Sequence, residues 1–189
     1  MTLRSRHVPP SAEPQPCAFV QPGPDRSLTA GPWLLAAADD PQRARKEWDE
    51  SGIALLRCGT RFTAVRLSAA LVRAAADTET LQDVDTCLAR ALLGGPVFAD
   101  TRWHLYYALV PEGTDRVPSW NYRSAGAECL GPNSYLGVPD LSRTRPGEGF
   151  SYWCVPLHTP GKLCSPDAVI QLVRYGRYRL TTTEAKTGA

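Results

Sequence analysis

Gly52-Ile-Ala-Leu-Leu-Arg-Cys-Gly59 and Arg61-Phe-Thr-Ala-Val-Arg-Leu67 are two short, largely apolar runs, separated by a link at Gly59-Thr60. The second run alternates in part between polar and apolar residues, as a strand with one buried face does. A short link that contains glycine is typical of a β-hairpin, because tight hairpin turns need a positive φ that glycine accepts. We therefore predict that residues 52–59 and 61–67 pair with each other as a hairpin.

Further extended segments follow on the C-terminal side of this stretch. Residues 96–99 and 104–110 are apolar runs joined around Asp100-Thr101-Arg102, which predicts a second strand pair. Residues 127–139 contain two short extended pieces around Gly131-Pro132-Asn133, and residues 150–157 form an aromatic strand. The polar segments 111–126 and 140–149 between them are predicted to be loops.

Helices are indicated by apolar spacing and by residues that cap helix ends. Residues 33–48 are interrupted at Asp40-Pro41, which predicts a new helix there with aspartate as N-cap and proline at its first position. Ser68 is the expected cap of a helix over 68–76, and Thr80 with Asp83 matches a capping box for a helix that ends near Gly94. A last helix, with a basic C-terminal part, is predicted to open at Ser165-Pro166.

This order of elements predicts an α+β fold, with a mainly antiparallel, twisted sheet of about five or six strands and helices packed on it. The 189 residues favour one domain, which we expect to span 32–180. Six prolines between Pro9 and Pro24 predict a disordered, proline-rich tail over 1–31. A second disordered tail is expected over 181–189.

The composition indicates a cytoplasmic protein. The start of the chain lacks the apolar region of a secretory signal, and the longest uncharged apolar stretch, 33–38, is far short of the roughly 20 residues that span a membrane. We therefore expect no membrane partner.

The 21 basic and 19 acidic residues give a net charge of +2, without the pronounced basic excess that is usual for nucleic-acid binders. We expect the six cysteines to be reduced thiols.

No intact catalytic motif is present, so the sequence favours a protein without enzymatic activity or cofactor. The acidic pairs Asp39-Asp40 and Asp83-Val-Asp85 stand at predicted helix starts, where aspartate caps free N–H groups. A zinc site is a minor alternative, since the spacing of its four candidate ligands lacks paired C-x2-C knuckles. These candidates, for which buried thiols and a surface histidine are the favoured interpretation, are Cys129, Cys154, His158 and Cys164.

The segment from Trp48 to Pro111 resembles the N-terminal domain of bifunctional DNA primase/polymerases, in the archaeo-eukaryotic primase group. The resemblance rests on Trp48 followed by Gly52-Ile-Ala-Leu-Leu-Arg-Cys-Gly59, and on the later segment Thr101-Arg-Trp-His104-Leu-Tyr-Tyr107. It implies that the second strand would carry metal-binding acids, but this chain has Ala64-Val-Arg66-Leu67 there. Arginine cannot ligate a metal cation, so two-metal phosphoryl transfer has no scaffold.

The chain also resembles an uncharacterised family of small actinobacterial proteins. The similar segments are Gly95-Pro-Val97, 108–111, 129–131, 134–139 and 163–169.

These observations lead to three hypotheses of function. The first is a non-catalytic, primase/polymerase-like domain that binds nucleic acid or a nucleotide, with Arg61, Arg66 and His104 as the contacts and Arg66 converting a lost metal site into a phosphate site. The second is a protein-interaction or regulatory domain, in which the last helix forms part of the surface. A small enzyme that uses His104 with a cysteine ranks third.

Overall fold

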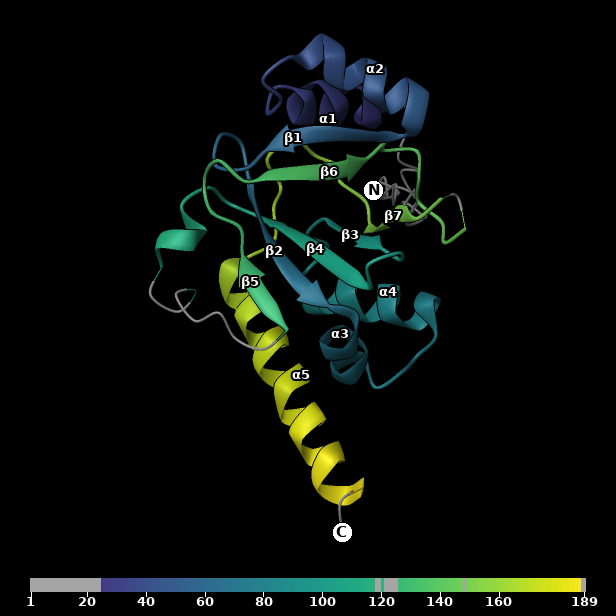
Figure 1. Ribbon diagram of the computed structural model, residues 1–189, viewed down its shortest axis with the longest axis vertical. Helices are drawn as coiled ribbons and strands as arrows, with labels where there is room; N and C mark the ends of the chain where they lie inside the picture. The colour runs from purple at the N-terminus through teal and green to yellow at the C-terminus, as the bar shows by residue number, and fades with distance from the viewer. Residues whose placement is uncertain (1–24, 118–119, 121–125, 148, 188–189) are drawn as a thin grey trace, which may run out of the picture.

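The computed structural model describes residues 25–117, 120, 126–147 and 149–187 (Figure 1). Of the predicted tails over 1–31 and 181–189, residues 1–24 and 188–189 lie outside this part. The described helices are α1 (Asp25–Leu35), α2 (Pro41–Ser51), α3 (Ala69–Ala76), α4 (Leu81–Ala91), the 3-10 helix η1 (Thr114–Arg116) and α5 (Pro166–Thr187). The strands are β1 (Ile53–Arg57), β2 (Thr63–Ser68), β3 (Val97–Asp100), β4 (Leu105–Val110), β5 (Ala127–Cys129), β6 (Tyr135–Pro139) and β7 (Ser151–Val155).

The described strands form two antiparallel sheets, which confirms the predicted α+β class. A five-stranded sheet has the order β5-β2-β4-β3-β7, and a two-stranded ribbon consists of β1 and β6. The predicted pair of residues 96–99 and 104–110 is confirmed as β3 and β4, in which Phe98 lies opposite Tyr107.

The predicted hairpin between β1 and β2 is wrong, although both strands exist. β1 pairs with β6, whereas β2 lies between β4 and β5. The glycine link does form a tight turn, since Gly59 has φ +88° and its N–H donates to the Phe62 carbonyl at 2.8 Å. However, this turn passes the chain from one sheet to the other. Both faces of β2 are largely buried, as expected for a central strand, and the local turn signal carries no information on its neighbours.

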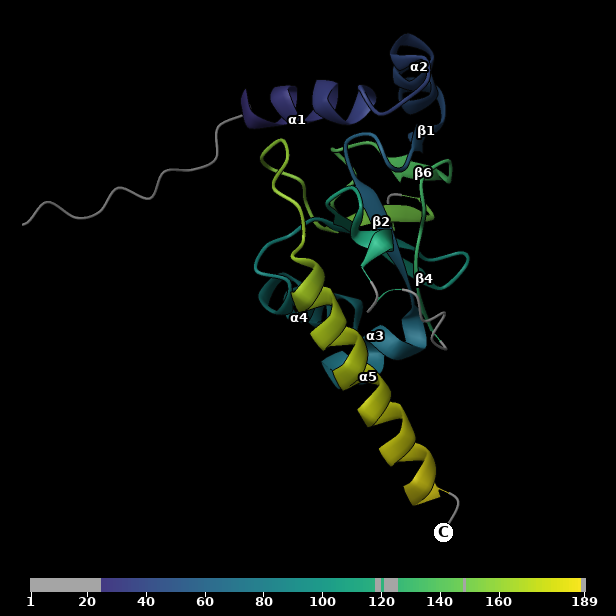
Figure 2. The same ribbon diagram turned by 90° about the vertical axis from the view of Figure 1, so that its left-hand side faces the viewer.

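One face of the five-stranded sheet is covered by helices. Val65 and Leu67 of β2 and Tyr106 of β4 belong to the apolar cluster on this face, which also includes Leu71 of α3 and Val169 of α5. In Figures 1 and 2, α3, α4 and α5 lie together on this side, and the C-terminal part of α5 extends beyond the body of the domain.

The other face is covered only in part, by the β1–β6 ribbon with α1 and α2 (Figure 1). Leu56 of the ribbon and Leu34 of α1 are fully buried, in one cluster with Phe98 and Trp153 of the sheet. Two indole groups fix the layers, because Trp48 Nε1 of α2 donates to the Val138 carbonyl at 2.9 Å and Trp153 Nε1 donates to the Pro139 carbonyl at 3.1 Å. The ribbon is therefore attached both to the helix above it and to the sheet below it.

The helix caps agree with the sequence in two cases and differ in a third. Asp40 Oδ1 accepts the N–H groups of Gln42 and Arg43, both at 3.0 Å, and Ser68 Oγ accepts the N–H of Leu71 at 3.3 Å. The predicted capping box at Thr80 is wrong, because the Thr80 side chain makes no cap hydrogen bond. Its carbonyl instead accepts the Asp83 N–H at 3.1 Å, which closes the first turn through the backbone.

Two helices extend into segments for which we expected no regular structure. α1 begins at Asp25, although it contains Pro32. α5 opens at Pro166 as predicted but continues to Thr187, past the expected end of the domain at residue 180. Among the described residues, no helix is both long enough and apolar enough to cross a membrane.

Two neighbouring leucines of β1 test the packing of the ribbon. Leu56 is completely buried against the sheet, whereas Leu55 is 52% exposed on the outer side of the ribbon. Leu56→Ala should lower the free energy of unfolding by about 2–5 kcal/mol, because it leaves a cavity in the core. Leu55→Ala should change it by about 0.5 kcal/mol or less. Urea denaturation of both variants checks this, and equal effects would contradict the described orientation of β1.

Candidate functional site

A row of residues runs across the five-stranded sheet on the face that the ribbon covers only in part. The strand registers place Glu128 of β5 opposite Arg66 of β2, Arg66 opposite Tyr107 of β4, Tyr107 opposite Phe98 of β3, and Phe98 opposite Trp153 of β7. Directly opposed residues in antiparallel strands point to the same face. The row therefore changes from an exposed, charged end to a buried, aromatic end, where the ribbon begins to cover the sheet.

The exposed end of this row combines a cation with an aromatic hydroxyl. Arg66 forms an ion pair with Glu128, and their side chains are 45% and 30% exposed. Such a solvated pair contributes little to stability, and the guanidinium group has further N–H donors to offer. The Tyr107 ring stacks on Phe98 at 4.9 Å between centroids. Burial raises the pKa of Tyr107, the charge of Asp100 adds to the rise, and Arg66 opposes it, so the hydroxyl is protonated at neutral pH.

The turn between β3 and β4 lies at the same end of the sheet, next to the Ser68–Leu105 pair, which is two residue pairs beyond Arg66–Tyr107. Asp100 Oδ1 accepts the N–H groups of Arg102 at 3.0 Å and Trp103 at 3.1 Å, which folds the turn. His104 closes the turn with φ +55°, in the left-handed region that disfavours side chains. Its carbonyl accepts the Ala69 N–H at 2.8 Å, which ties the turn to α3.

This turn presents a solvent-exposed aromatic ring beside a cation. Trp103 is 69% exposed, which is unusual for a tryptophan, and the Arg102 guanidinium carbon lies 6.0 Å from the centre of its ring. Phe150 is also exposed and lies close by, since its carbonyl accepts the Thr101 N–H at 2.8 Å. We call the group of Arg66, Tyr107, Arg102, Trp103 and His104 the sheet-end surface.

The structure brings two of the three predicted contact residues to the same end of β2. Arg66 and His104 belong to the sheet-end surface, and both are exposed. Arg61 is also exposed, but it comes before β2, which begins at Thr63. His104 lies at the other end of β2, where its carbonyl accepts the N–H of Ala69. At about 3.3 Å per residue, Arg61 and His104 are roughly 20 Å apart. The three residues are therefore spread along the length of β2, from its start to the β3–β4 turn at its end, and do not surround one cleft.

The sequence pattern did not indicate the partner of Arg66 or the role of the β3–β4 turn. Glu128 could not be predicted, because it reaches Arg66 only through the pairing of β5 with β2 across 62 residues of sequence. The role of Asp100 in the turn could have been recognised from the sequence. An aspartate in a turn commonly accepts hydrogen bonds from the backbone N–H groups two and three residues after it. Trp103 lies at the tip of this turn and is exposed, which the sequence pattern alone does not indicate.

A buried polar cluster lies on the opposite face of the sheet, beneath α4. The Tyr152 hydroxyl donates to Asp85 Oδ1 at 3.2 Å. Asp85 is therefore not a helix cap, as the sequence had suggested, but a partner of the core. Burial raises its pKa, while bonds from Cys154 and Tyr152 oppose the rise. Burial is also the main cause that raises the pKa of Tyr106 to about 12, so this hydroxyl keeps its proton.

The cysteines of the described residues are free thiols, and Cys17 lies outside this part of the chain. Burial is the main cause that raises the pKa of Cys129 and of Cys164 to about 12, so both are protonated at neutral pH. Within the residues that the structure describes, which include Cys154 and His158, no three side chains of the metal-binding types come together. The four candidate zinc ligands thus do not converge.

Comparisons with known proteins return no match, whether with family models, with curated proteins or with solved structures. The resemblance to primase/polymerases therefore stays a prediction.

The backbone of His104 provides a test of the turn geometry. His104→Gly should raise the free energy of unfolding by roughly 0.5–1 kcal/mol, because glycine adopts a positive φ without the clash of a Cβ. His104→Ala should give no such gain, since alanine keeps the Cβ. Thermal and urea denaturation of the two variants measure the difference. A glycine variant that is less stable than the alanine variant would contradict the left-handed conformation.

Proposed function

We propose that the sheet-end surface binds a nucleotide, either free or within a single strand of nucleic acid, without converting it chemically. The observation that carries the proposal is the exposed Trp103 ring with Arg102 beside it, on the same end of the sheet as Arg66 and His104. Exposed aromatic rings stack on bases of any sequence, and neighbouring arginines contact the phosphates. A surface of this kind needs no pronounced net charge on the whole protein, because the contacts are local.

Arg66 is suited to a phosphate contact. Its present partner is the partly exposed Glu128, which a phosphate oxygen can replace at little cost because solvated ion pairs are weak. Charge-assisted bonds from arginine to phosphate are strong and directional. Tyr107 lies opposite Arg66 with a protonated hydroxyl, which adds a neutral donor next to the cation. Binding without conversion accords with the absence of an acidic pair at Ala64-Val-Arg66-Leu67.

The proposal is tested by fluorescence anisotropy of a labelled single-stranded oligonucleotide, titrated at low and at physiological salt. Trp103→Ala should weaken binding roughly ten-fold, because stacking contributes about 1–3 kcal/mol per base. Arg66→Ala should weaken binding by a similar factor and reduce the slope of affinity against salt by about one. Unchanged binding by both variants, or no binding at low salt, would contradict the proposal.

Arg43→Ala is the matched control for the loss of charge. Arg43 is an exposed arginine in an ion pair with Glu47 at 3.0 Å, but it lies on α2, which Figure 1 places at the far end of the molecule. This variant should bind as the unaltered protein does. Arg61→Ala then measures the extent of the ligand: it should weaken binding of an oligonucleotide that spans β2 but not of a mononucleotide used as competitor.

A protein-binding role is the second candidate, favoured by the exposed rings on α5. Tyr175 and Tyr178 are 49% and 64% exposed, on a helix whose end extends beyond the domain (Figure 2). Rings of this kind are enriched in protein interfaces. If the oligonucleotide fails to bind, this face of α5 is the next surface to test.

A further inference from the structure

The ion pair of Arg66 and Glu128 places a hydrogen-bond donor and an acceptor side by side at the exposed end of the row. The two residues lie directly opposite each other in β2 and β5, and Arg66 Nη2 donates to Glu128 Oε2. Opposed side chains in antiparallel strands have Cβ atoms about 4.5–5.5 Å apart. Both side chains reach solvent, with 45% and 30% of their surfaces exposed. A ligand group that contacts Arg66 is therefore close to the carboxylate of Glu128.

A carboxylate beside the phosphate contact restricts which ligands fit there. An ionised carboxylate accepts hydrogen bonds but donates none, so it has no bond to offer to a phosphate oxygen, and the two negative charges repel each other. The carboxylate suits a ligand that brings an O–H donor close to the phosphate. Glu128 thus selects among the phosphate-bearing ligands that Arg66 attracts.

The backbone of RNA carries such a donor next to each phosphate. The 2′-hydroxyl of a ribonucleotide is bonded to the carbon atom adjacent to the one that carries the 3′-phosphate, so an acceptor and a donor lie side by side. DNA has the phosphate without the hydroxyl, and contacts to this hydroxyl are how proteins distinguish the two nucleic acids. The phosphate and 2′-hydroxyl of RNA are therefore complementary to the guanidinium of Arg66 and the carboxylate of Glu128.

We infer that the sheet-end surface binds single-stranded RNA in preference to DNA, with Arg66 on a phosphate and Glu128 accepting the adjacent 2′-hydroxyl. This inference rests on the proposed function and adds the identity of the sugar to it. The two oxygens of a carboxylate offer about four acceptor sites, so Glu128 can accept the hydroxyl whether or not Arg66 stays bonded to it. Trp103 lies toward β4, on the other side of Arg66 from β5, where it stacks on a neighbouring base.

The inference is tested by fluorescence anisotropy of the full chain with two labelled oligonucleotides of one sequence. One is RNA, and the other is DNA with uracil in place of thymine, so that they differ only in the 2′-hydroxyl. The unaltered protein should bind the RNA about ten-fold more tightly, the factor expected for one hydrogen bond to a charged acceptor. Glu128→Ala should bind both about equally, and it should fold, because a solvated ion pair contributes little to stability.

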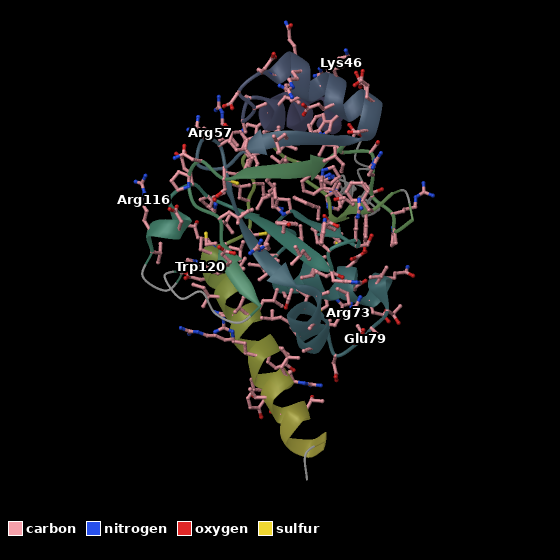
Figure 3. The ribbon with its side chains drawn as sticks, viewed as in Figure 1. Lys46, Arg57, Arg73, Glu79, Arg116 and Trp120 are labelled. Carbon is pink, nitrogen blue, oxygen red and sulfur yellow. The ribbon has the colours of Figure 1, made fainter. Side chains whose placement is uncertain are left out.

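Glu79→Ala is the matched control, because Glu79 is also an exposed glutamate in an ion pair with an arginine, Arg73, at 3.0 Å. Figure 3 shows this pair beside α3, and the variant should keep the preference for RNA. Equal binding of RNA and DNA by the unaltered protein would overturn the inference and leave the proposed function standing. A preference for RNA that persists in Glu128→Ala would overturn it as well. If neither oligonucleotide binds at low salt, the proposed function fails, and the inference fails with it.

Discussion

The β1–β6 ribbon packs on one face of the five-stranded sheet through the buried side chains of Leu56, Phe98 and Trp153, and the indole of Trp153 bonds to the Pro139 carbonyl. How much of this face of the sheet stays exposed depends on how far the ribbon extends over it. Because the ribbon covers only the Phe98–Trp153 end of the row that contains Arg66, the end of β2 and the tip of the β3–β4 turn remain exposed. The sheet-end surface is thus a consequence of incomplete coverage, on a sheet whose other face packs against α3, α4 and α5.

Two separate environments meet at the β3–β4 turn. At the open end of the sheet, Arg66, Arg102 and Trp103 are exposed, and these are the side chains of the proposed binding surface. On the helix-covered face, Arg73 of α3 and Tyr106 of β4 line a small hollow behind the turn. His104 borders both, in a backbone conformation that is costly for a side chain. The turn is therefore the part of the fold where strain, exposed aromatic surface and buried polar groups come together.

Much of the fold could be predicted from the sequence, because strands and helix caps are set by local patterns. Asp40 and Ser68 cap the helices that their positions indicate, and β3 and β4 pair as expected. The partners of β1 and β2 could not be predicted, since a glycine turn gives the same local signal whether the chain returns to the same sheet or enters another. Of the site, Arg66 and His104 could be selected by residue type, whereas Glu128 reaches Arg66 only through the register of β5 and β2.

The most direct test of the account maps the bound ligand on the protein by chemical-shift changes in a ¹⁵N-labelled sample titrated with a short single-stranded oligonucleotide. Binding at the sheet-end surface should give saturable changes at Arg66, Tyr107 and residues 100–104, and the outer face of the ribbon around Leu55 should be unaffected. Changes confined to α5, or spread evenly over the surface without saturation, would contradict the claim that the uncovered end of the sheet is the binding surface.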